Sequence, residues 1–134
     1  MITRLVLADD NRQFRDSVRA LLHKQPGLKV EGEAQDGVAA IRLARELEPD
    51  VVIMDVVMPN LNGIEATRQI VSSLPHVKVI ALSVHADKRF VEAMLGAGAS
   101  GYLLKDQAFN ELPMAIRTVV GGQTYFSPEI AGND

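Results

Sequence analysis

Three acidic side chains in this 134-residue chain directly follow short runs of apolar residues. Asp9 and Asp10 come after residues 5–8, and Asp55 comes after residues 51–54. Acids that meet in one place repel one another unless a cation lies between them. A hard divalent ion that is held by a few carboxylates and by water has the chemistry of magnesium. Any one of these acids could be a solvated loop residue or a helix N-cap. The Mg²⁺ site is indicated by the three acids together.

Two further polar side chains stand in equivalent places. Ser83 directly follows the apolar run 77–82, and Lys105 follows residues 102–104. A phosphoryl group needs an acceptor, a metal to offset its charge, a fixed cation and a hydroxyl or amide donor. These roles are available from Asp55, the Asp9–Asp10 pair, Lys105 and Ser83, in that order. Alone, the lysine is explained as a surface residue and the serine as a helix cap.

The apolar runs that precede these residues predict strands of a parallel sheet that is covered on both faces. Five strands are expected, at residues 5–8, 28–34, 51–54, 77–82 and 102–104. Between and after them, helical spacing of apolar residues predicts five helices, whose apolar stripes begin at Phe14, Ala40, Ala66, Phe90 and Leu112. This α/β alternation implies a doubly wound sheet, in which ligands lie beyond the carboxyl ends of the strands.

Length and composition narrow the classes of protein. The chain is long enough for one domain, expected at residues 1–120, with residues 121–134 as a C-terminal tail or the start of a linker. The net charge of −3 gives no general attraction to nucleic acid or to anionic lipid. Cysteine is absent, which excludes thiolate catalysis and disulfides. The apolar run near the start is too short for a signal peptide or a membrane span, so a cytoplasmic location is expected.

Taken in order, these residues resemble the receiver domain of two-component response regulators, over essentially the whole chain. The matching features are Asp9-Asp10, Asp55 within residues 53–59, Asn62-Gly63, Leu82-Ser83, and residues 101–105. Residues 97–106, with Gly121-Gly122 and residues 125–128 beyond them, resemble the NarL/FixJ subgroup, whose receiver precedes a LuxR-type helix-turn-helix. The expected strand order is the flavodoxin-like order 2-1-3-4-5.

The resemblance implies a role for each residue of the metal site. Asp55 accepts the phosphoryl group. Asp10, Asp55 and the main-chain carbonyl of Val57 ligate Mg²⁺ directly, and Asp9 acts through water. The chain would then catalyse only its own phosphoryl transfer and dephosphorylation, and would otherwise not be an enzyme.

The resemblance also implies how the signal enters and leaves the domain. Ser83 bonds a phosphoryl oxygen, Lys105 pairs with the phosphoryl charge, and Tyr102 changes rotamer on activation. A sensor histidine kinase is the expected donor, and a phosphorylation-dependent homodimer is the expected product. A DNA-binding domain is expected beyond Asp134, whereas no direct DNA binding is expected of this fragment.

Two alternatives come from other functional classes. A haloacid dehalogenase-type phosphatase also uses a nucleophilic aspartate and Mg²⁺. Such enzymes carry an Asp-x-Asp motif, whose second aspartate is the acid/base, and Val57 stands at that position here. Without that acid a leaving group is not protonated. A receiver-like module that binds proteins without being phosphorylated is the other alternative, and the complete set of five site residues argues against it.

Overall fold

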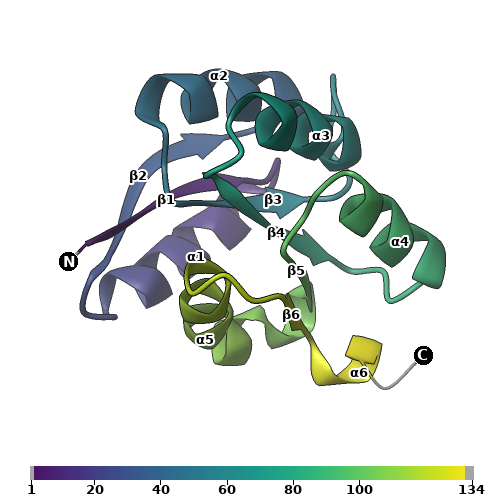
Figure 1. Ribbon diagram of the computed structural model, residues 1–134. Helices are drawn as coiled ribbons and strands as arrows, with labels where there is room; N and C mark the ends of the chain where they lie inside the picture. The colour runs from purple at the N-terminus through teal and green to yellow at the C-terminus, as the bar shows by residue number, and fades with distance from the viewer. Residues whose placement is uncertain (1, 132–134) are drawn as a thin grey trace.

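The computed structural model describes residues 2–131. Its centre is one sheet of six strands, all paired in parallel, in the order β2-β1-β3-β4-β5-β6 (Figure 1). The strands are β1 Thr3–Ala8, β2 Leu28–Ala34, β3 Val51–Asp55, β4 Lys78–Ser83, β5 Gly101–Leu104 and β6 Tyr125–Phe126. The α-helices are α1 Arg12–His23, α2 Gly37–Leu47, α3 Gly63–Ser73, α4 Lys88–Gly96, α5 Ala108–Val120 and α6 Pro128–Ala131, with a 3₁₀ turn, η1, at Lys105–Gln107.

The helices cover both faces of the sheet. In Figure 1, α1 and α5 lie below the sheet and α2 and α3 lie above it. Alternate side chains of a strand therefore enter different cores. In β1, Leu5 and Leu7 pack with α1 and α5, whereas Val6 and Ala8 join the core under α2, α3 and α4. All five residues of β3 are buried, as predicted for a strand covered on both faces.

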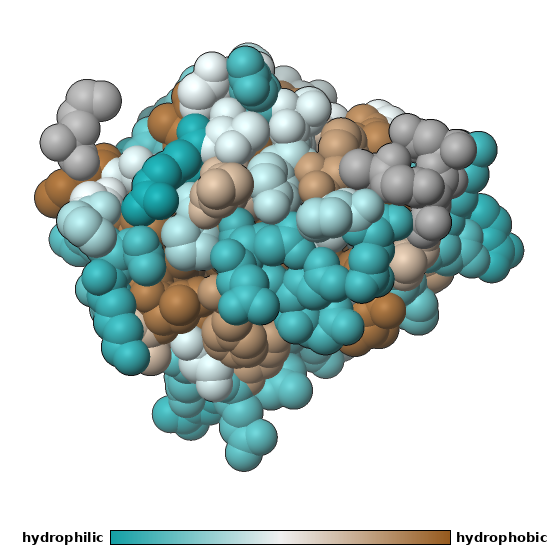
Figure 2. Space-filling model, turned by 90° about the horizontal axis from the view of Figure 1, so that it is seen from below, coloured by the Kyte–Doolittle hydropathy of each residue, from teal (hydrophilic) through white to brown (hydrophobic). Residues whose placement is uncertain are grey.

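The helices α1 to α4 begin where a side chain accepts a hydrogen bond from one of their free N–H groups. Asn11 and Asn62 accept hydrogen bonds from the main-chain N–H groups of Phe14 and Glu65, which lie three residues further on. The loops before these caps contain or follow the acidic residues: residues 9–11 join β1 to α1, and residues 56–62 join Asp55, at the end of β3, to α3. No helix of residues 2–131 is both long and apolar enough to span a bilayer. Seen from below, the surface is largely hydrophilic, with hydrophobic patches in separate places (Figure 2).

The prediction of five strands and five helices is wrong in number, although the order 2-1-3-4-5 is confirmed within the larger sheet. The additional strand β6 lies beside β5, and α6 follows it. The N–H groups of Tyr125 and Ser127 donate to the carbonyls of Ser100 and Tyr102, both at 3.0 Å. A strand of two residues is too short to show an apolar periodicity in the sequence. It is held by main-chain hydrogen bonds to β5, which do not depend on residue type.

Part of the expected tail therefore packs on the domain. Ser127 and Ile130 are buried, and Ile130 belongs to the core that also contains Tyr102. Residues 132–134 lie outside the described residues. The boundary at residue 120 between the domain and a linker stays a prediction.

Candidate functional site

The carboxyl ends of four neighbouring strands bring the predicted polar residues to one edge of the sheet. Asp9 follows β1, Asp55 ends β3, Ser83 ends β4 and Lys105 follows β5. One carboxylate oxygen from each of Asp9, Asp10 and Asp55 lies within 4.8 Å of the others. Asp9 and Asp55 are buried and Asp10 is exposed. The structure thus forms an acidic pocket, which is the cluster of these three residues.

Lys105 supplies the cation of the pocket. Its Nζ lies 2.7 Å from Asp9 Oδ2 and 3.2 Å from Asp55 Oδ2, and its side chain is 19% exposed. Burial opposes the charged form, but the contact with Asp9 and the charges of both acids outweigh burial and raise the pKa of Lys105. The lysine is therefore held as a cation. Its Nζ also lies 4.8 Å from the ring centre of Phe14, a residue whose place beside the pocket the sequence did not indicate.

Asp55 is an acid in an unfavourable environment. Burial raises its pKa, the charge of Asp9 raises it further, and Lys105 only partly offsets both effects. Its Oδ1 accepts a 3.3 Å hydrogen bond from the N–H of Val57, and its Oδ2 accepts one from Lys105. A second cation in the pocket would stabilise the ionised form of this carboxyl.

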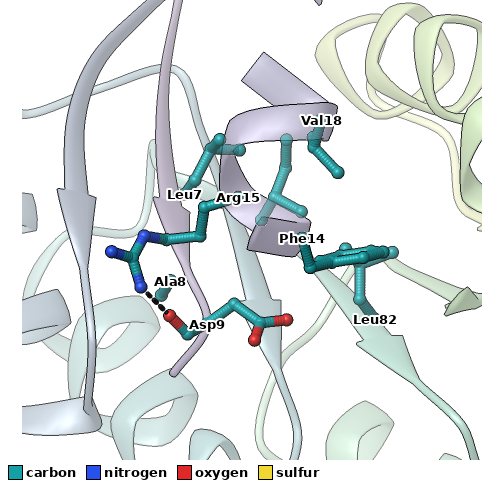
Figure 3. Close-up of a pocket in the computed structure, with 8 residues that line it drawn as sticks. Leu7, Ala8, Asp9, Phe14, Arg15, Val18 and Leu82 are labelled. Atoms are coloured by element: carbon teal, nitrogen blue, oxygen red, sulfur yellow. Dashed lines mark hydrogen bonds between the residues drawn. The ribbon is translucent and has the colours of Figure 1, made fainter. Parts of the chain in front are cut away.

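The turn between β1 and α1 holds Asp9 from several sides. Its N–H donates to Ala34 O at 3.0 Å, and its Oδ1 accepts from the N–H of Asn11 at 2.8 Å. Its carbonyl oxygen accepts from Arg15 Nη1 at 2.5 Å, and Figure 3 shows the carboxylate of Asp9 pointing away from this contact. Beneath the turn lies a cavity of only about 10 Å³, lined mainly by apolar side chains that include Leu7, Phe14 and Leu82.

The donor set fits a hard cation. Asp9 Oδ2 is buried, and its one polar contact among residues 2–131 is the ion pair with Lys105 Nζ at 2.7 Å. Asp10 leaves its carboxylate exposed at the mouth of the pocket. Carboxylate oxygens with room for water suit Mg²⁺. The nearby side chain of Val57 is 55% exposed and apolar, so it offers no acid to protonate a leaving group.

Ser83 and Tyr102 are joined through the loop after β4. Ser83 Oγ accepts from the N–H of His85 at 2.9 Å, and the hydroxyl of Tyr102 donates to His85 O at 2.8 Å. Tyr102 is fully buried, so its ring points into the protein. The His85 ring stacks on Phe90 at 4.5 Å between ring centres. The sequence placed His85 only two residues beyond Ser83 and did not indicate its hydrogen bonds or its stacking.

Comparison with known proteins agrees with this geometry. The family described as "Response regulator receiver domain" matches residues 5–117. Response regulator GacA of Pseudomonas protegens is 44% identical over 128 residues, which are 96% of this chain and 60% of that protein. Transcriptional regulatory protein DegU of Brevibacillus brevis is 40% identical over 129 residues, which are 96% of this chain and 55% of that protein. The chain thus spans less than two thirds of the length of these relatives.

Solved structures agree in the same way. A LuxR-family two-component response regulator from Aurantimonas sp. SI85-9A1 has a TM-score of 0.94 and 37% identity, with 98% of this chain and 94% of that chain covered. The receiver domain of the putative response regulator NarL from Mycobacterium tuberculosis has a TM-score of 0.87 and 33% identity, with 91% and 98% covered. The chain therefore belongs to the response regulator receiver domain family and is a receiver of the NarL/FixJ type.

Proposed function

We propose that this domain is a phosphorylation-dependent signalling switch in which Asp55 accepts a phosphoryl group with the help of Mg²⁺. One observation carries the proposal: a buried aspartate at the carboxyl edge of the sheet lies 3.2 Å from a lysine cation and within 4.8 Å of two further acids. A charge-balanced pocket of this kind suits phosphoryl transfer, which depends mainly on positioning and electrostatics.

The acidic pocket supplies the metal ligands in this proposal. Asp10, Asp55 and the main-chain carbonyl of Val57 ligate Mg²⁺ directly, and Asp9 acts through water. When bound, the metal offsets the negative charge of the phosphoryl oxygens. The buried carboxylate of Asp9 and the exposed carboxylate of Asp10, both close to Asp55, support this assignment.

The remaining site residues act on the phosphoryl group. An oxygen of Asp55 forms a bond to phosphorus while the bond from phosphorus to an imidazole nitrogen of the donor breaks. The donor is a phosphorylated histidine of a sensor kinase. Lys105 pairs with one phosphoryl oxygen and the hydroxyl of Ser83 donates to another. Hydrolysis of the aspartyl phosphate by water, at the same residues, restores the unphosphorylated domain. The domain is proposed to act on no other substrate.

The output is a change in the surface around β4 and β5. A phosphoryl group adds up to about two negative charges and three acceptor oxygens. If Ser83 Oγ turns to donate to this group, it gives up its position as acceptor for His85 N–H, and the hydrogen-bonded link to Tyr102 rearranges. Homodimerisation follows from the altered surface. Two well-separated arrangements of a packed interior make such a switch discrete.

The whole protein is proposed to regulate transcription. Relatives named as response or transcriptional regulators are longer than this chain, which supports a DNA-binding output domain outside residues 1–134. With a net charge of −3, this domain alone is not expected to bind DNA specifically. The proposed site of action is the cytoplasm, where a bacterial regulator reaches both its kinase and DNA.

The proposal is tested by measuring intact mass after incubation with acetyl phosphate and Mg²⁺. The native chain should gain one phosphoryl group, and Asp55→Asn should gain none because the change removes the nucleophile and keeps the shape of the side chain. A phosphorylated Asp55→Asn chain would show that another residue is the acceptor. A native chain that gains no mass would favour the protein-binding alternative.

A further inference from the structure

Arg15, in the first turn of α1, is partly buried although the sequence gives it no role. Its side chain is only 11% exposed. Its Nη1 donates to the carbonyl oxygen of Asp9 at 2.5 Å, and its Nε donates to Glu33 Oε1 at 3.0 Å. Figure 3 shows the guanidinium folded back from α1 toward the end of β1. Arg15 therefore joins the acidic pocket to the neighbouring strand β2.

Glu33 holds the guanidinium in this place. Its second oxygen, Oε2, accepts from Arg19 Nη1 at 2.9 Å, so one carboxylate binds two arginines on the same side of α1. Arg19 is half exposed and, within the described part of the chain, pairs with Glu33 alone, whereas Arg15 also reaches Asp9. The two arginines thus form a natural pair for comparison, because they share a partner and a helix but differ in their contact with the pocket.

Three hydrogen bonds and the ion pair with Lys105 orient Asp9, and Arg15 makes one of the hydrogen bonds. The N–H of Asp9 is bonded to β2, its Oδ1 is bonded to the N–H of Asn11, and its carbonyl is bonded to Arg15. Without Arg15 the peptide between Asp9 and Asp10 loses its only side-chain donor among residues 2–131. This peptide sets where both carboxylates point.

We propose that Arg15 is a positioning residue for the Mg²⁺ site: it holds the Asp9–Asp10 peptide so that both carboxylates face Asp55. The inference rests on the proposed function, because that function supplies the metal. Side chains that orient metal ligands typically change metal affinity by about 10- to 100-fold when removed. Arg15 acts through Asp9 and has no place in the reacting atoms.

The charge of Arg15 predicts the opposite effect, which makes the test decisive. A cation near the pocket repels Mg²⁺, so if charge alone mattered, Arg15→Ala would tighten metal binding. If positioning dominates, the same change weakens it. The pair Arg15→Ala/Glu33→Gln removes one positive and one negative charge together, so it leaves the net charge unchanged and isolates the positional effect.

Mg²⁺ binding is measured by calorimetric titration of the full chain, with folding checked by circular dichroism. We expect Arg15→Ala and Arg15→Ala/Glu33→Gln to bind Mg²⁺ about tenfold or more weakly than the native chain. Arg15→Lys keeps one donor and should recover part of the affinity, and it also serves if the alanine variant does not fold. Arg19→Ala should bind as the native chain does.

A second readout separates positioning from general damage. With acetyl phosphate, the Mg²⁺ concentration for half-maximal phosphorylation should rise in Arg15→Ala, while the rate at saturating Mg²⁺ stays close to the native rate. Equal or tighter Mg²⁺ binding by Arg15→Ala would overturn the proposal, and so would an equal loss in Arg19→Ala. If the native chain binds Mg²⁺ but takes no phosphoryl group, the proposed function fails and the comparison of the arginines still stands.

Discussion

Ser127→Ala should destabilise the domain because it removes a hydrogen bond to a residue 23 positions earlier in the chain. Ser127 Oγ accepts from the N–H of Leu104 at 3.1 Å, and the contact is buried. Leu104 is the last residue of β5 and directly precedes Lys105. The substitution removes the acceptor and leaves a main-chain donor without a partner inside the protein.

The expected size follows from the cost of an unsatisfied buried donor, about 1–3 kcal/mol. Globular proteins unfold with about 2.1 cal/mol/K of entropy per residue, which gives about 280 cal/mol/K for 134 residues. Dividing the free-energy cost by this entropy of unfolding gives a fall in Tm of about 4–11 °C. Because the bond holds the end of β5, the loss should also lower the rate of phosphorylation through a less well held Lys105.

Differential scanning calorimetry of the native chain and Ser127→Ala gives both Tm and the enthalpy of unfolding. Ser100→Ala is the matched control, since Ser100 lies at the other end of β5, where only its main-chain groups bond to Val79 and Tyr125. That control should unfold within about 2 °C of the native chain, as surface substitutions usually do. An unchanged Tm in Ser127→Ala would refute the reasoning, because it would mean that β6 and Ser127 do not hold β5 in solution.

Three further predictions concern the pocket. Asp10→Ala should weaken Mg²⁺ binding in a calorimetric titration because it removes a charged ligand, and an unchanged affinity would contradict the metal site. The pKa of Asp55 is raised from its ordinary value of 3.8, so without Mg²⁺ the native chain should lose stability relative to Asp55→Asn as pH rises above 3.8 through the raised pKa. Denaturant titrations of both chains between pH 3.5 and about 8 would measure this difference, and a gap that is constant with pH would disprove the linkage. Beryllofluoride, a phosphoryl mimic, should change the self-association of the native chain, measured by analytical ultracentrifugation, or the environment of Tyr102, measured by NMR. The response of Ser83→Ala should be smaller. An equal response in both chains would exclude the route through Ser83.

The central strands and the pocket could be predicted because one cause produces both. Strands covered on both faces read as continuous apolar runs, so the sequence marks where β1, β3, β4 and β5 end. Parallel strands place those ends at a common edge, which brings Asp9, Asp55, Ser83 and Lys105 together without any further information.

The parts that were not predicted depend on long-range contacts between main-chain or partly polar groups. The strand β6 forms because the N–H groups of Tyr125 and Ser127 bond to carbonyls along the outer edge of β5. No periodic pattern in the sequence indicates such pairing. Arg15 and Arg12 have the same chemistry, and only the fold shows that Arg15 is partly buried and bonded to Asp9 whereas Arg12 is exposed. The inward ring of Tyr102 is a choice of rotamer, which residue types do not encode.

The short strand β6 also bears on how the sheet meets other chains. A free strand edge exposes N–H and C=O groups that pair readily with strands of other molecules, and this pairing starts aggregation. Here the outer side of β5 is bonded to residues 125–127, and the strand left outermost is only two residues long, from Tyr125 to Phe126. A chain that ends before residue 124 would present the bare edge of β5, where Tyr102 and Leu103 are buried in the intact domain. Residues 125–127 thus protect this edge of the sheet from pairing with other chains, a role separate from that of the acidic pocket.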